Sequence, residues 1–105
     1  MKNYILEACV DSVESAVIAT NAGANRLELC SNLIIGGTTP TLAMFQQVCK
    51  RCDNKIHVLI RPRFGDFCYT EDEFEVMKEE VRQYKKFGAD DPMLGDLNLK
   101  EYCYN

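Results

Sequence analysis

The sequence predicts an α/β fold in which parallel strands alternate with helices. Three short segments rich in aliphatic residues have the composition of buried strands: residues 4–10, 26–30 and 56–61. A helical pattern of apolar residues follows each of them, and the strands are too far apart for hairpins. Consecutive strands joined through a helix pair in parallel, with right-handed crossovers. We therefore expect the element order β-α-β-α-β-α.

The composition fits one soluble domain. The chain has 105 residues, 47% of them hydrophobic, which is enough for a modest core. A run of about 18 apolar residues is absent, and acids interrupt the N-terminal apolar segment, so we expect neither a membrane span nor a signal peptide. The net charge of −4, without a basic patch, argues against a nucleic-acid partner. Six cysteines without a secretion signal indicate reduced thiols in a cytoplasmic protein.

Residues that cap or break helices mark the ends of the first two helices. Asp11 fits an N-cap, with Glu14 at the third helical position to complete a capping box. Gly23 is placed to end that helix. Thr39–Pro40 predicts the start of the second helix, since proline suits the first turn of a helix.

The third helix has the most complete set of helical signals. Thr70 is the predicted N-cap, and Glu73 completes its capping box. Acidic residues lie in its first turn and lysines in its last, as the helix dipole favours. Gly88 is placed to end it. The predicted buried stripe consists of Phe74, Met77, Val81 and Tyr84.

A weak internal repeat divides the chain near residue 90. Gly23-Ala24-Asn25 leads from the first helix into the second strand, and Gly88-Ala89-Asp90 leaves the third helix in the same way. A fourth strand should begin at residue 91, but the chain continues DPMLGDLNLKEYCYN, with an early proline and no aliphatic run. We therefore expect the repeat to stop there, with residues 1–90 as the structured part and 91–105 as a divergent tail.

Alternation along the strands sorts their side chains into two faces. The aliphatic face would pack against the helices, which leaves the polar face in the interior of the curved sheet, near the carboxyl ends of the strands. In parallel α/β folds that end is where ligands bind. The polar face comprises Glu7, Cys9, Glu28, Cys30, His57, Leu59 and Arg61.

Cys9 and Cys30 are the candidate metal ligands on this face. Neighbouring parallel strands lie about 4.8 Å apart, so two thiols at matching heights could share a soft ion such as Cu(I). Inert packing is the alternative, because cysteine is a common small buried residue. The Cys49-x-x-Cys52 spacing falls at a helix end rather than a helix start, which favours packing over redox or metal chemistry. The single histidine, His57, is expected to be structural.

Arg61 and Arg63 lie on either side of a proline where the third strand ends, and they are the candidate anion ligands. A guanidinium presents a rigid fork of donors that suits a carboxylate or a phosphate. The Gly36–Gly37 loop before the second helix could add backbone amides to such a site. The alternative is a buried network in which both arginines pair with Glu7 and Glu28.

Four segments resemble the CutC family of copper homeostasis proteins: CVDSVESA (9–16), NRLELCSNL (25–33), GGTTPTL (36–42) and IRPRFGDFCYTEDEFEVMKEE (60–80). The resemblance covers residues 4–90 almost continuously. It implies a TIM (β/α)8 barrel of about 250 residues, of which this chain would form about three βα units, truncated after residue 90. It also implies a cytoplasmic copper-binding protein that holds Cu(I) through Cys9 and Cys30.

The resemblance also implies a wider set of residues at the barrel mouth. The acids and arginines of the family correspond here to Glu7, Glu28, Arg61, Arg63 and Asp66. The family usually has glycine at the position of Phe64, so we expect a narrower mouth in this chain. No catalytic residue is implied. The expected partner is a copper ion, without nucleic acid or membrane. The full-length protein is free to form a homo-oligomer, and a eukaryotic member is also expected in the nucleus.

Three functions are open at the level of the sequence. The first is Cu(I) binding by a protein of the CutC type. The second is an enzyme-like barrel that binds a small anionic metabolite through Arg61, Arg63 and the glycine loop, with Glu7 or Glu28 as general base. The third is a truncated isoform without a function of its own, because three isolated βα units leave a sheet edge unpaired.

Overall fold

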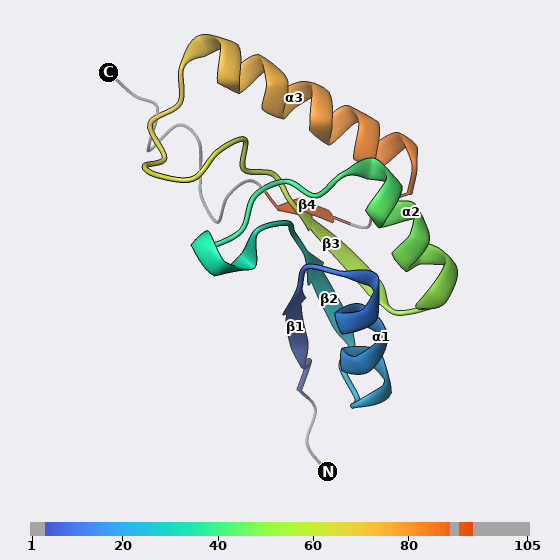
Figure 1. Ribbon diagram of the computed structural model, residues 1–105. Coiled ribbons are helices and arrows are strands. Elements are labelled where there is room, and N and C mark those ends of the chain that lie inside the picture. The colour runs from blue at the N-terminus through green and yellow to red at the C-terminus, as the bar shows by residue number, and fades with distance from the viewer. Residues whose placement is uncertain (1–3, 89–90, 94–105) are drawn as a thin grey trace.

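The structure, a computed structural model, describes residues 4–88 and 91–93. Its four strands form one parallel sheet in sequence order, and Figure 1 shows the three α-helices along one side of it. The predicted alternation of strands and helices is therefore confirmed. The elements are β1 (Glu7–Val10), α1 (Val13–Asn21), β2 (Arg26–Leu29), the short 3₁₀ helix η1 (Leu33–Ile35), α2 (Leu42–Arg51), β3 (Lys55–Leu59), α3 (Glu71–Lys86) and β4 (Asp91–Met93).

β4 extends the repeat beyond the point at which the sequence predicted it to stop. Its three residues pair with β3, with Met93 opposite Leu59. Pro92 is tolerated because β4 is the last strand of the described sheet, and an edge strand does not need every backbone N–H for pairing. The expectation of no strand after residue 90 was therefore wrong for β4. The rest of the expected tail, 94–105, lies outside the described residues.

The aliphatic face of the sheet packs against the helices, as the alternation predicted. Leu27 and Leu29 of β2 are buried, and so are Ile56, Val58 and Ile60 in and after β3. Burial of each such side chain favours the folded state by about 1.5–3 kcal/mol. The polar residues of the strands are left on the opposite face. The helices contribute Ala16, Phe45, Val48, Met77 and Tyr84 to this core.

α1 is capped one residue later than predicted. The Ser12 hydroxyl accepts a hydrogen bond from the Ser15 amide at 3.0 Å, and the Ser15 hydroxyl accepts one from the Ser12 amide at 3.2 Å. The expected box of Asp11 and Glu14 was therefore wrong. Serine caps a helix about as well as aspartate, and both pairs have the same three-residue spacing, so the sequence offers two boxes between which only the fold selects.

α2 starts two residues later than predicted, whereas the predicted capping box of α3 is confirmed. The N-cap of α2 is Thr41, whose hydroxyl accepts from the Met44 amide at 3.1 Å. Thr39, the expected start, instead accepts from the Arg61 amide through its hydroxyl at 2.8 Å, so it is tied to the end of β3.

None of the described helices is long and apolar enough to span a membrane.

Candidate functional site

The polar face of the sheet gathers predicted site residues at the carboxyl ends of the strands. The register places Cys9 of β1, Glu28 of β2 and His57 of β3 side by side. Cys30 follows β2 directly, and its amide donates to Val10 O at 3.0 Å. The strand arrows in Figure 1 point toward η1 and the loop after β3, so these two loops border the site. By alternation, Cys9, Glu28 and Cys30 share one face.

The two predicted metal ligands share that face but not a height. Cys9 lies opposite Glu28, so Cys30 is two residues further along the neighbouring strand. Two residues of strand span about 6.6 Å, and the expectation of thiols at matching heights was therefore wrong. The register depends on how the helices hold both strands against the core, which the residue pattern of each strand does not reveal. A metal ion shared by both thiols would lie on the diagonal between the strands.

Cys30 is the more protected of the two thiols. It is 1% exposed, whereas Cys9 is exposed, and its Sγ donates to Val10 O at 3.6 Å. The pKa of Cys30 is raised to about 11, first by burial and then by Cys9, Glu28 and Asp11, whose negative forms oppose a thiolate. The Cys30 thiol therefore keeps its proton at neutral pH.

The loop between β2 and α2 covers Cys30. Ser31 and Thr38 form an antiparallel bridge at its base. Gly37 has a φ of +90°, and a Cβ at this position would lie 2.8 Å from Leu59 Cδ2 and 3.3 Å from Cys30 Sγ. Glycine alone permits both this backbone conformation and this close approach. The amides of the glycine pair donate to carbonyls within the loop, so the predicted anion-binding loop is instead a cover over the thiol.

Arg61 is buried and holds this loop through carbonyl groups. Its Nη1 donates to Gly37 O at 3.0 Å and to Ile35 O at 3.4 Å, and its Nη2 donates to Gly65 O at 2.9 Å. The guanidinium also lies 5.1 Å from the centre of the Phe67 ring. Within the described part of the chain, no carboxylate forms an ion pair with Arg61, and its Nε has no hydrogen-bond partner. The alternative of pairing with acids of β1 and β2 was wrong for this arginine, because the carbonyls of two loops converge on it.

Arg63 is occupied by the loop that follows it and by the start of α3. Its Nε donates to Glu73 Oε2 at 2.6 Å, and its Nη2 donates to Asp66 Oδ1 at 3.2 Å. The pKa of Asp66 is lowered, first by the hydrogen bond from the Cys68 amide and then by Arg63. The pKa of Glu73 is lowered, first by the Thr70 amide and then by Arg63. Arg63 and Asp66, both predicted mouth residues, thus fix the loop, and Arg63 does not pair with acids of the first two strands.

Glu7 takes part in a separate set of contacts on the polar face. Its Oε2 accepts from Arg26 Nε at 2.8 Å and lies 3.3 Å from His57 Nδ1. His57 is buried in the sheet, which agrees with its predicted structural role. Arg26 and Glu7 are 19 residues apart in the sequence, and the strand register that brings them together cannot be read from the residue pattern of either strand.

Among the residues that the structure describes, the remaining cysteines do not add a metal centre. Cys52 is buried at the end of α2, as predicted for a packing residue, whereas Cys49 is exposed and does not belong to the buried face of the helix. Within residues 4–88 and 91–93, no group of three or more His, Cys, Asp or Glu side chains is arranged to hold a metal ion. A soft ion that accepts two thiols remains compatible with Cys9 and Cys30.

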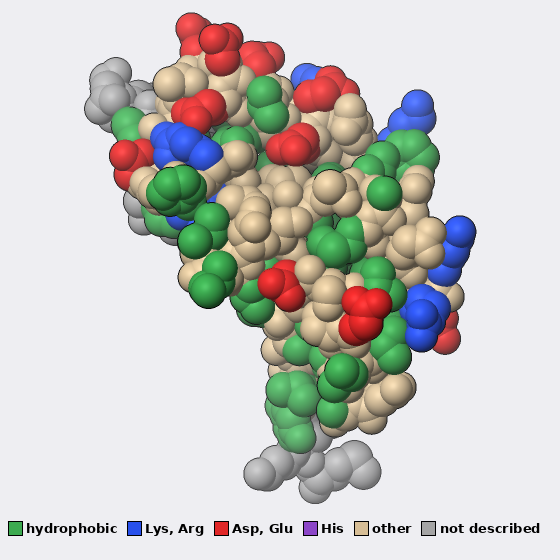
Figure 2. All heavy atoms as spheres, in the orientation of Figure 1, with side chains coloured by type: hydrophobic (Ala, Val, Ile, Leu, Met, Phe, Trp, Pro, Cys, Tyr) green, Lys and Arg blue, Asp and Glu red, His purple; other side chains and the backbone are tan. Residues whose placement is uncertain are grey.

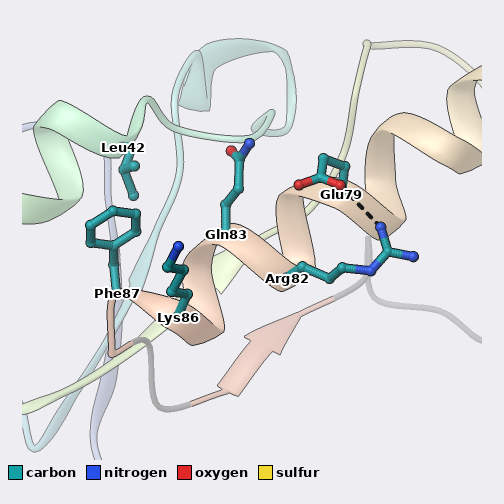
Figure 3. A pocket seen from close by; sticks show the side chains of 6 residues that line it. All are labelled: Leu42, Glu79, Arg82, Gln83, Lys86 and Phe87. Carbon is teal, nitrogen blue, oxygen red and sulfur yellow. Dashed lines mark hydrogen bonds and ion pairs between the residues drawn. The ribbon is translucent and has the colours of Figure 1, made fainter.

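A separate groove of about 380 Å³ lies on the helical side of the molecule. Figure 3 shows Leu42 of α2 facing Phe87 across it, with side chains of α3 along its length. The ion pair between Arg82 Nη1 and Glu79 Oε1 at 3.0 Å joins two exposed side chains of its wall. This pair is satisfied within the wall and is open to water, so the strand ends remain the better candidate site. The groove is lined by Leu42, Glu79, Arg82, Gln83, Lys86 and Phe87.

The parallel repeat and its polar strand ends define an α/β protein of the class that places ligands at the carboxyl edge of its sheet. The model of the CutC family matches residues 4–102, and the chain belongs to this family. The match extends beyond residue 90, where a boundary was expected. The predicted family is confirmed.

Relatives of this chain carry names that refer to copper. The copper homeostasis protein cutC homolog of Mus musculus is 50% identical over 105 residues, which cover 95% of this chain and 39% of the mouse protein. The Homo sapiens homolog is also 50% identical, with coverage of 95% and 38%. A family protein CutC from Bacteroides fragilis is 43% identical over 100 residues. The chain spans about two fifths of the length of these relatives.

A solved structure agrees with the fold. The crystal structure of a CutC protein from Streptococcus agalactiae matches with a TM-score of 0.75 and 30% sequence identity, over 87% of this chain and 45% of that protein. The described sheet therefore corresponds to part of a CutC fold of the TIM-barrel type, as the sequence predicted.

Proposed function

We propose that this chain takes part in copper homeostasis by binding Cu(I) in the cytoplasm, through Cys9 and Cys30. One observation carries the proposal: the two cysteines lie on the same face of neighbouring strands, at the carboxyl edge of a parallel sheet. Soft thiolate ligands select Cu(I) over hard cations. Copper is the cargo of such a site, and the names of the relatives support the choice of this ion.

The charge around Cys30 also favours a cation. Glu28 lies opposite Cys9 in the register, and both Glu28 and Asp11 act electrostatically on the Cys30 thiol. A thiolate formed by proton loss alone would meet these negative charges, whereas a Cu(I) ion that replaces the proton neutralises part of them. Cys9, which is exposed, offers the first point of contact for an incoming ion.

An anion-binding function receives less support. Arg63 is occupied by Glu73 and Asp66, and the guanidinium of Arg61 is turned into the carbonyls of its neighbouring loops. An anion would have to displace these protein groups before it met either guanidinium. We therefore do not propose a metabolite site at these residues.

A Cu(I) competition titration tests the copper proposal. The Cys9→Ala, Cys30→Ala double variant should lose affinity for Cu(I) by more than the about 10–100-fold that changes outside the ligand shell cost. The matched control is Cys49→Ala, Cys68→Ala, which removes two exposed cysteines elsewhere and should leave the affinity unchanged. Equal affinities of the two double variants would overturn the proposal.

A further inference from the structure

The loop of residues 31–38, which lies over Cys30, is held in place by a side chain from the end of another strand. Cys30 follows β2, and the loop of residues 31–38 folds back over it so that Gly37 has no room for a Cβ beside the Cys30 thiol. The group that holds this loop is the guanidinium of Arg61, just after β3. Closure over the thiol therefore depends on a side chain that does not belong to the loop.

A single guanidinium ties two loops together. Its Nη1 bonds to the carbonyls of Ile35 and Gly37, which flank Gly36, and a Cβ at Gly36 would lie 3.0 Å from this same nitrogen. Its Nη2 reaches Gly65 O in the loop after β3. If the guanidinium contacts of Arg61 are lost, the bridge between Ser31 and Thr38 and the hydrogen bonds between Thr39 and the Arg61 backbone remain. What is lost is the side-chain link from Ile35 and Gly37 to Gly65 in the loop after β3.

When the 31–38 loop lies closed over Cys30, the charged guanidinium of Arg61 is buried, and this burial costs free energy that opening of the loop would recover. Arg61 is 8% exposed, its partners in the described chain are neutral carbonyls and an aromatic ring, and its Nε lacks a hydrogen-bond partner. Burial of a cation without a carboxylate is costly, and so is an unmade hydrogen bond in the interior. Opening of the loop would hydrate the guanidinium and remove this cost. The energetic penalty of the closed arrangement therefore makes opening easier.

We infer that Arg61 is a positioning residue for the Cys30 site, because its guanidinium holds the 31–38 loop closed over the thiol. We call the hydrogen bonds from this guanidinium to Ile35, Gly37 and Gly65 the clasp. A soft metal ion reaches Cys30 when the clasp opens. The part that concerns the metal rests on the proposed function. The closure itself concerns only the access of any small reagent to Cys30.

Thiol alkylation with N-ethylmaleimide, quantified at each cysteine by mass spectrometry, measures the clasp in the 105-residue chain without copper. Arg61→Gln should raise the alkylation rate of Cys30 by about tenfold or more, the factor expected for loss of hydrogen bonds from a charged donor. Arg63→Gln is the matched control, because it removes a loop-fixing guanidinium that does not contact the 31–38 loop, and should leave the Cys30 rate unchanged.

Cys52 serves as an internal standard, because it is buried in the core at the end of α2. A rise at Cys30 with Cys52 still protected supports a local clasp. An unchanged Cys30 rate in Arg61→Gln, or an equal rise at both cysteines, overturns it. Gly37→Ala tests the cover without touching the arginine, since its Cβ would meet Leu59 and Cys30. This variant should also alkylate faster at Cys30, and a wild-type rate would contradict the inference.

The rate and extent of Cu(I) uptake by the same proteins separate the two proposals. With the proposed function and the clasp both correct, Arg61→Gln takes up Cu(I) faster than the wild-type chain and requires Cys30 to do so. Absence of Cu(I) binding by the wild-type chain would remove the metal part, while faster alkylation would keep the clasp. Unchanged alkylation would remove the clasp whatever the copper result.

Discussion

Thr39 shows how one side chain can join three elements. Its hydroxyl accepts from the Arg61 amide at 2.8 Å and donates to Glu80 Oε1 of α3 at 3.4 Å. Its own amide donates to Arg61 O at 2.9 Å. The residue therefore links the loop before α2, the end of β3 and the middle of α3. In the sequence it looked like a helix start, because a threonine before a proline is typical of that position.

Glu80 gives this junction a pH dependence. Burial raises its pKa, and the hydrogen bond from Thr39 opposes part of that rise. Because the folded-state pKa is above the unfolded-state value, the contribution of Glu80 to stability is complete below the unfolded pKa of about 4.5 and is lost as pH rises through the folded pKa. Ionised Glu80 is therefore unfavourable at neutral pH.

Glu80→Gln should raise the free energy of unfolding at about pH 7 and give little change near pH 4. The glutamine keeps an oxygen acceptor for Thr39 and removes the charge. Urea unfolding at the two pH values measures the effect. Glu79→Gln, one residue away on an exposed part of α3, is the control and should not reproduce the gain at neutral pH. A gain of equal size at both pH values would contradict the explanation.

At the scale of elements, the first turn of α3 is fixed to the loop that leads into it from β3. Glu73 accepts from the Thr70 amide at 2.8 Å in the capping box and from Arg63 Nε at 2.6 Å. One carboxylate thus caps the helix and holds the loop that leads from β3 into it. Arg63, which the sequence suggested as a ligand for a bound anion, is instead paired with the carboxylate of Glu73 from the same chain.

Thr70→Ala should lower the free energy of unfolding by about 1 kcal/mol, the usual cost of a lost N-cap. Glu73→Ala should cost more, because it removes both the return bond of the box and the partner of Arg63. Glu71→Ala, an exposed acid in the same turn, is the control and should cost less than either. Chemical denaturation of the three variants provides the comparison. An order in which Glu71→Ala costs as much as Glu73→Ala would refute the dual role.

The elements were easier to predict from the sequence than the contacts between them. Period and capping signals sufficed for α3 because every signal in that segment agrees. The aliphatic and polar faces of the strands were also predictable, since they follow from alternation alone. The pairing of Cys9 with Glu28 and the partners of Arg61 were not, because they depend on strand register and on loop carbonyls. The copper site stays a prediction for the same reason: it requires two side chains from different strands.

At the scale of the whole molecule, the β1 side of the described sheet is open. β1 pairs with β2 and is the first strand in the sheet order. Tyr4, Ile5 and Leu6 lead into it and are exposed, and Figure 2 shows hydrophobic side chains gathered over this end of the molecule, beside the grey N-terminal residues. An exposed strand edge with apolar residues is a template for association with another chain.

The 105-residue chain should therefore self-associate in solution through this edge, and Ile5→Lys should weaken that association by about tenfold, the factor expected when one large aliphatic contact is lost. A lysine near an edge strand opposes pairing by its charge. Ile18→Lys is a close control: Ile18 is 68% exposed on α1, against 63% for Ile5, so both changes replace a similarly exposed isoleucine. Sedimentation velocity over a range of concentrations measures both variants. An equal effect of the two substitutions, or a wild-type chain that stays monomeric throughout, would show that the β1 edge does not drive association.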